Sequence, residues 1–176
     1  MQQVAHYIAP QSKVAAYAEG EGRNAVYVAQ QGHHVVAYDY APSGLRKTAA
    51  LADKKGVSVG TVQVDLVTDE LPEAQYDAAL MVFGHFAKQH QYHVLNKIVA
   101  SIKPGGFLLL EVYEEAQINF ETGGPRNIDW LYNAEQVMQW SKQHTTLKHF
   151  FVGEVDRTEG MLHTGKCSVI QIVLEK

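Results

Sequence analysis

The chain has 176 residues, 46% of them hydrophobic and 19% charged, which is the length and composition of one globular domain. A formal net charge of -4, with no run rich in Lys and Arg, argues against a protein that binds nucleic acid by neutralising phosphates. No apolar run reaches the ~20 residues that span a bilayer, and no signal peptide is visible, so neither a membrane nor secretion is expected.

Apolar strands alternate with helical patterns along most of the chain. Hydrophobic spacing and turn residues predict strands over 13–18, 34–38, 61–64, 78–83 and 107–112, and helices over 23–31, 42–55 and 91–102. After these, the pattern predicts a helix over 134–144 and two strands, 147–155 and 167–174, that form a β-hairpin. The segment 114–132 between these two parts is polar and irregular.

This alternation predicts an α/β fold in a single domain over residues 1–176. We expect a Rossmann-like, doubly wound, mostly parallel sheet with helices on both faces and a C-terminal antiparallel β-hairpin. In such sheets, ligands bind beyond the carboxyl ends of the strands, where the strand order reverses. The glycine turn at 18–25, Asp39, Asp65 and His85 each follow one of the first four strands. These polar features should therefore meet at one edge of the sheet.

The turn after the first strand, AEGEGRNA at 18–25, is the most informative stretch. Its G-x-G-x-x-A pattern matches the dinucleotide-binding fingerprint, and Asp39 after the next strand is suitably placed to bind a ribose. Glu19 and Glu21, however, place two carboxylates where a pyrophosphate would lie, and like charges about 4 Å apart repel by roughly 1 kcal/mol in water. A cationic nucleoside suits this turn better, and S-adenosylmethionine, with its sulfonium and ammonium groups, is the obvious one.

Three short stretches carry a family resemblance: EGRNA at 21–25, GHHV at 32–35 and the KPGG turn at 103–106. Over about residues 13–112 the chain resembles the class I S-adenosylmethionine-dependent methyltransferases, and within them the branch that contains tellurite-resistance-type methyltransferases. The resemblance implies an enzyme that uses S-adenosylmethionine as its cofactor. It also implies in-line methyl transfer to a small-molecule acceptor, for which positioning is the main requirement.

The resemblance assigns roles to residues around the cofactor. Asp39 would accept hydrogen bonds from the ribose hydroxyls, Tyr40 would lie against the adenine, and Asp65 would accept from the adenine amino group. The full set expected to bind the cofactor is Ala18, Glu19, Gly20, Gly22, Arg23, Asn24, Asp39, Tyr40, Asp65, Leu66 and Phe83. His85 is the candidate catalytic residue, because an imidazole with an ordinary pKa of ~6.5 can take a proton from an acceptor at neutral pH. The candidate substrate-binding residues, in and beside the irregular segment, are Tyr113, Arg126 and Tyr132.

Several alternatives stay open from the sequence. Arg23 suits the carboxylate of the cofactor and, equally, an ion pair with Glu19 or Glu21. A non-catalytic cofactor-binding module is one alternative function, because the family usually has an acidic residue in place of Ala16 and a glycine in place of Ala18. An NAD(P)-dependent oxidoreductase is another, since the glycine pattern is ambiguous.

The remaining expectations concern partners and location. The family usually has a helical cap before the first strand, and only residues 1–12 precede it here, so the acceptor site is either open or completed by a second subunit of a homodimer. The single cysteine, Cys167, excludes an internal disulfide and fits a reducing compartment, and we expect the protein to be cytoplasmic. His90 and His93 have no cysteine or acidic neighbours at metal-ligand spacing, so no metal is expected.

Overall fold

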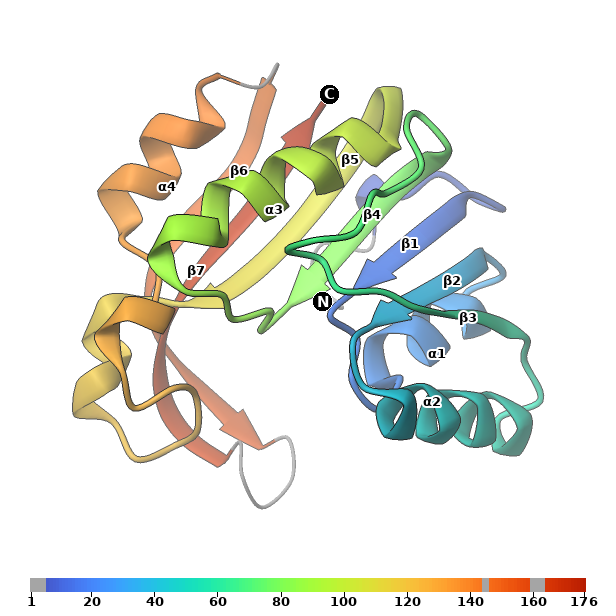
Figure 1. Cartoon of the computed structure of the whole chain (residues 1–176), viewed down its shortest axis with the longest axis horizontal. Coiled ribbons are helices and arrows are strands. Elements are labelled where there is room, and N and C mark those ends of the chain that lie inside the picture. The colour runs from blue at the N-terminus through green and yellow to red at the C-terminus, as the bar shows by residue number, and fades with distance from the viewer. Residues whose placement is uncertain (1–5, 144–145, 159–163) are drawn as a thin grey trace.

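The computed structural model describes residues 6–143, 146–158 and 164–176. Its elements in chain order are β1 (Lys13–Tyr17), α1 (Arg23–Gln30), β2 (His34–Asp39), α2 (Pro42–Lys54), β3 (Val59–Gln63), β4 (Tyr76–Val82), α3 (Lys88–Ser101), β5 (Ile102–Tyr113), η2 (Glu115–Asn119), η3 (Ile128–Trp130), α4 (Ala134–Ser141), β6 (Thr146–Thr158) and β7 (Thr164–Glu175). The strands form one sheet in the order β3-β2-β1-β4-β5-β7-β6 (Figure 1). β7 is antiparallel to β5 and β6, and the other neighbouring pairs are parallel. The predicted fold class is confirmed.

Helices cover both faces of the sheet because its central strands are apolar on both sides. Four of the five residues of β1 and five of the seven residues of β4 are buried. α1 and α2 lie on one face of the sheet, and α3 and α4 lie on the other (Figure 1). Within the described ranges, no helix is both long enough and apolar enough to cross a membrane.

The third helix begins earlier than its hydrophobic spacing predicts. α3 starts at Lys88, three residues before the expected start, and its first turn contains the buried polar residue Gln91. The side-chain amide of Gln91 donates to the carbonyl oxygens of Phe86 and Leu131, each at 3.1 Å. Because a buried polar group is tolerated once its hydrogen bonds are made, this turn is helical without contributing to the apolar pattern.

The KPGG turn at 103–106 lies inside β5 rather than before it. The register between β4 and β5 shifts just after the pair formed by Ile102 and Tyr76. A Cβ on Gly106 would lie 2.5 Å from the carbonyl oxygen of Asp77, so only glycine lets the two strands approach here. The turn therefore acts as a bulge that restores pairing between the buried parts of β4 and β5.

The sheet reverses its order at β1. From β1 the chain continues outward through β2 to β3, and then returns to place β4 on the other side of β1. The loops that follow β1 and β4 therefore diverge to opposite faces and leave a crevice at their carboxyl ends, where open α/β sheets bind ligands.

Candidate functional site

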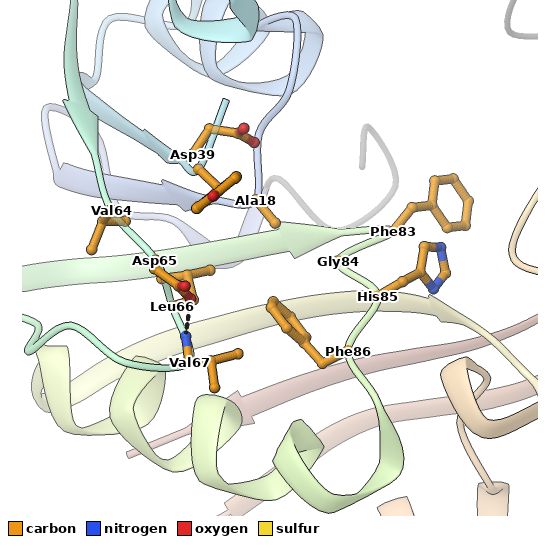
Figure 2. Close-up of a pocket in the computed structure, with 11 residues that line it drawn as sticks. Ala18, Asp39, Val64, Asp65, Leu66, Val67, Phe83, Gly84, His85 and Phe86 are labelled. Carbon is orange, nitrogen blue, oxygen red and sulfur yellow. Dashed lines mark hydrogen bonds between the residues drawn. The ribbon is translucent and has the colours of Figure 1, made fainter. Parts of the chain in front are cut away.

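A cleft of about 350 Å³ opens at this reversal of strand order. Its lining comes from the loops that follow β1, β2, β3 and β4 (Figure 2). The residues that line it are Ala18, Asp39, Tyr40, Val64, Asp65, Leu66, Val67, Phe83, Gly84, His85 and Phe86. The cleft thus brings together the predicted candidates Ala18, Asp39, Tyr40, Asp65, Leu66, Phe83 and His85. Its volume lies within the range of small-molecule sites.

Asp39 at the end of β2 connects two loops of the cleft. Its Oδ2 accepts a hydrogen bond from the backbone N–H of Gly20, and its Oδ1 accepts one from the N–H of Ala41, both at 2.8 Å. These bonds fix the plane of the carboxylate against the glycine turn and the start of α2. Each carboxylate oxygen has a second lone pair for a ligand hydroxyl, so the arrangement leaves Asp39 able to bind a ribose.

Glu19 turns away from the cleft toward the start of α1. Its side chain is buried, and its Oε1 accepts hydrogen bonds from the backbone N–H groups of Asn24 and Ala25, each at 2.8 Å. Burial raises the pKa of the Glu19 carboxyl to about 7. Glu21 points outward, where it pairs with Lys47. Neither carboxylate lines the cleft, although the sequence argument placed both of them against the ligand.

Two of the four non-glycine residues with a positive φ in the described ranges lie where the loops after β1 and β4 meet. Ala18 and Phe83 have φ angles of +50° and +60°, in the left-handed region that disfavours residues with a Cβ. A Cβ on Gly84 would lie 2.5 Å from the sulfur of Met81 and 3.2 Å from the Cβ of Ala18. The missing side chain at Gly84 therefore lets the two loops touch, and such strain is typical of functional sites.

The loop after β3 forms another wall of the cleft. Oδ1 of Asp65 accepts a hydrogen bond from the N–H of Val67 at 2.8 Å, which fixes the carboxylate at the cleft surface (Figure 2). Leu66 beside it is buried, whereas Tyr40, from the loop after β2, is 70% exposed. An apolar surface, an exposed aromatic ring and a carboxylate are what a nucleobase needs for stacking and for an edge contact.

Aromatic rings form the opposite end of the cleft. Phe83 and His85 lie side by side, away from Asp39 and Asp65 (Figure 2). Both rings stack on Tyr113, with centroid distances of 4.2 Å for Phe83 and 5.3 Å for His85. Tyr113 is itself buried and does not line the cleft, so it supports this end from behind rather than facing a ligand.

No pattern in the sequence predicts which residues hold this aromatic stack in place. The guanidinium of Arg157 on β6 lies 4.9 Å from the centroid of the Phe83 ring and forms an ion pair with Glu111 on β5. A Cβ on Gly124 would lie 2.8 Å from the Tyr113 ring. Arg157 and Glu111 are 46 positions apart and belong to ordinary strand patterns, so no local sequence signal marks them.

Two other substrate candidates lie outside the cleft lining. Tyr132 is buried, and its hydroxyl donates to the carbonyl oxygen of Gly84 at 3.2 Å, so it holds the loop after β4 in place. Arg126 is exposed, and its guanidinium donates to the carbonyl oxygen of Phe120 at 2.9 Å.

The cofactor candidate Arg23 is exposed on α1 and is not among the residues that line the cleft. Within the described ranges, no group of three or more His, Cys, Asp and Glu residues could hold a metal ion.

The segment after β5 is an ordered part of the fold. Gln117 of η2 is buried, and its Oε1 accepts a hydrogen bond from the N–H of Ser168 on β7 at 2.7 Å. Its side-chain amide donates to the carbonyl oxygen of Gly123 at 3.0 Å. At the far end of the segment, the N–H of Tyr132 donates to the carbonyl oxygen of Tyr113. Both ends are therefore attached to the sheet.

The sequence of residues 14–106, more than half of the chain, matches a protein family described as a methyltransferase domain. The chain belongs to this family. A comparison with curated proteins found none that matches the sequence of this chain. All the residues that line the cleft lie in the matched region, which includes the glycine turn and the loops after β2, β3 and β4.

Solved structures share the fold of this methyltransferase domain at low sequence identity. TehB from Haemophilus influenzae is 15% identical with a TM-score of 0.82, and the match covers 99% of this chain and 60% of TehB. The domain therefore spans about three fifths of that protein. A methyltransferase from Methanosarcina mazei is 13% identical with a TM-score of 0.77, over 100% of this chain and 97% of the other. The Burkholderia thailandensis 1,6-didemethyltoxoflavin-N1-methyltransferase, solved with 1,6-didemethyltoxoflavin and S-adenosylhomocysteine, is 21% identical with a TM-score of 0.72, over 99% and 75%.

The methyltransferase domain uses S-adenosylmethionine as its cofactor, and the chemistry of the cleft fits this group. The lining contains the two acidic side chains Asp39 and Asp65 and no Lys or Arg, a composition that complements a cation. Gly20 has a φ of +66°, and no atom lies within 4 Å of the position of its absent Cβ, so the turn leaves open space beside it. The first amides of α1, which would bind the pyrophosphate of a dinucleotide, are already occupied by Glu19.

Proposed function

We propose that this domain methylates a small-molecule acceptor that binds beside Phe83 and His85. The observation that carries the proposal is the polarity of the cleft, which has Asp39 and Asp65 on one side and aromatic rings at the other end. Bound S-adenosylmethionine supplies an electrophilic methyl group on its sulfonium. The carboxylate side suits the nucleoside of the cofactor, which leaves the aromatic end for the acceptor.

We assign the cofactor contacts on the side of the cleft that carries the carboxylates. Asp39 would bind the ribose hydroxyls with the lone pairs that Gly20 and Ala41 leave free. Tyr40 and Leu66 would lie against the adenine, and Asp65 would accept from its amino group. The strained turn from Ala18 to Gly22 would carry the methionine part. In this assignment, Ala18, Gly20 and Gly22 contact the cofactor through their backbone atoms. Glu19 and Asn24 support the turn instead of contacting the cofactor.

His85 is the candidate base at the acceptor end. Its Nδ1 is buried, so Nε2 is the nitrogen that would take a proton from an acceptor. The parallel stack with Tyr113 fixes the plane of the imidazole, and Phe83 beside it offers an apolar surface. A flat acceptor with a proton to lose suits this end best. The fold shared with the didemethyltoxoflavin methyltransferase, which binds a small molecule, supports the same class of acceptor.

The tellurite-resistance-type branch is the finer family assignment that we propose. Its support is the EGRNA sequence at 21–25 together with the fold likeness to TehB. The alternative of an NAD(P)-dependent oxidoreductase loses its main support, because a pyrophosphate would have to displace the buried Glu19 carboxylate from the start of α1.

A labelled-methyl assay tests the proposal. The protein is incubated with S-adenosylmethionine carrying a labelled methyl group and a panel of small thiols, amines, phenols, heteroaromatic rings and oxyanions, with RNA and a peptide library in parallel. We expect transfer to a small molecule. We also expect H85N to reduce the rate about a hundredfold or more while leaving cofactor affinity intact, the typical effect of losing a general base. The half-buried His90, which does not line the cleft, provides the matched control H90N. Transfer only to RNA or peptide, or equal rates for H85N and H90N, would overturn the proposal.

A further inference from the structure

Glu19 occupies an unusual place for a carboxylate. It follows Ala18 in the cleft wall, yet its side chain is 9% exposed and points into the fold. Both of its hydrogen-bond donors, the N–H groups of Asn24 and Ala25, bind the same oxygen, Oε1. Its own N–H donates to the carbonyl oxygen of Tyr38 on β2. The residue therefore ties the glycine turn to α1 on one side and to β2 on the other.

The charges around Glu19 do not compensate for its burial. Burial is the largest cause that raises its pKa to about 7, and the carboxylate of Asp39 on β2 raises it further. The two hydrogen bonds from α1 and the positive charge of Arg23 on α1 lower the pKa, but by less than burial raises it. The nearby α2 contributes Lys47, which pairs with Glu21 outside. The positive charge of Arg23 therefore compensates the ionised form of Glu19 only in part.

We propose that Glu19 releases a proton to solvent when the cationic cofactor binds, so that this positioning residue couples the affinity for S-adenosylmethionine to pH. A sulfonium and an ammonium placed on the strained turn from Ala18 to Gly22 add positive charge next to a buried carboxyl. An adjacent positive charge favours the ionised carboxylate. The ionised form also strengthens both hydrogen bonds to the start of α1, because charge-assisted bonds are the stronger ones.

The coupling discriminates between substrate and product. S-adenosylhomocysteine lacks the sulfonium charge, so its binding should draw a smaller fraction of a proton from Glu19. If the cofactor lowers the pKa of Glu19 by one unit, binding of S-adenosylmethionine becomes ~5-fold tighter between pH 6 and pH 8. The affinity for the product should change less over the same range. The inference rests on S-adenosylmethionine as the cofactor and is independent of the acceptor.

Calorimetric titration of the whole chain tests the coupling without relying on turnover. S-adenosylmethionine and S-adenosylhomocysteine are each titrated at pH 6, 7 and 8 in two buffers that differ in ionisation enthalpy, which gives the number of protons released. For the unmodified protein near pH 7 we expect release of up to roughly half a proton with S-adenosylmethionine, and less with S-adenosylhomocysteine. Binding without measurable proton release would overturn the proposal, even if every variant failed to fold.

Two variants assign the proton to Glu19. E19Q keeps an oxygen that can accept both N–H groups of α1, so it should fold and bind, but without the proton release that Glu19 contributes and with a weaker dependence of the affinity on pH. E21Q removes an exposed charge two residues away and should leave the release unchanged. Release that persists in E19Q, or disappears in E21Q, would assign the proton to another group. Failure of the unmodified protein to bind either nucleoside would overturn the proposal together with the cofactor assignment.

Discussion

The buried carboxyl of Glu19 should make the stability of the free protein depend on pH in a way that one substitution removes. Burial raises the pKa of this acid from 4.5 to about 7. Between these two values the folded state binds more protons than the unfolded state, so the free energy of unfolding falls as the pH rises through this window. Because each pKa unit corresponds to about 1.4 kcal/mol, the contribution lost between pH 4 and pH 8 is about 3 kcal/mol.

The variant E19Q keeps the hydrogen-bonding oxygen and removes the charge. It should have nearly the same stability as the unmodified protein at pH 4.5, and should be the more stable of the two by about 3 kcal/mol at pH 8. For a chain of this length that is a difference of roughly 6–12 °C in Tm. Urea and thermal unfolding, followed by circular dichroism in steps from pH 3 to pH 8, measure the difference directly.

Two results would refute this reasoning about Glu19. One is a stability difference between E19Q and the unmodified protein that stays constant across the pH range. The other is a variant that is less stable at pH 8. E21Q is the control with the opposite sign, because the hydrogen bond from Lys47 lowers the pKa of Glu21. The stabilisation by that exposed pair is present above pH 4.5 and is lost as the pH falls.

Three other substitutions probe the packing around the cleft. G22A should lower the free energy of unfolding by about 2 kcal/mol or more, because Gly22 has a φ of +87° and a Cβ there would lie 2.7 Å from the Cα of Thr48. R157A should cost about 3 kcal/mol or more, since it leaves the buried carboxylate of Glu111 without its ion-pair partner. A18G should stabilise the protein by about 0.5 kcal/mol, because relief of left-handed strain exceeds the entropy that glycine adds to the unfolded chain. Urea unfolding at pH 7 measures all three.

Control variants and contrary outcomes test the physical cause given for each of these three substitutions. G32A removes a glycine with a φ of +89° and no atom within 4 Å of the position of its absent Cβ, so it reports the conformational cost alone. A G22A effect no larger than that of G32A would contradict the steric argument. K166A breaks the exposed pair with Glu154 and should cost less than about 1 kcal/mol. An equal loss in R157A would show that burial of its ion pair does not matter. A loss above about 1 kcal/mol in A18G would show that Ala18 is not strained.

The sequence predicted those parts of the site that depend on strand order. Asp39, Asp65 and His85 each follow a strand with clear apolar spacing, and topology alone brings such residues to one edge. The direction of the Glu19 side chain was not predictable, because a carboxylate in a turn can face a ligand or cap the helix. The family usually has a glycine at position 18, and Ala18 adopts the left-handed conformation that glycine favours although it carries a Cβ.

Contacts between distant segments could not be predicted from the sequence. The ion pair of Arg157 with Glu111, which supports the ring of Phe83, depends on the pairing of β5, β7 and β6. Tyr113 and Tyr132 were expected to contact a substrate because they flank an irregular segment. Both are buried supports, and only the three-dimensional packing distinguishes a ring that lines a cleft from a ring that lies behind it.

The attachment of the segment after β5 has a consequence for how the enzyme can diversify. Gln117 and Tyr132 fix the two ends of this segment to the sheet, whereas Ile118, Ile128 and Trp130 between them are exposed. These three positions can be exchanged without altering the backbone that carries them, and none of them lines the cleft. Substitutions at these positions should therefore change the outer surface of this segment, whereas the residues that line the cleft all come before residue 87.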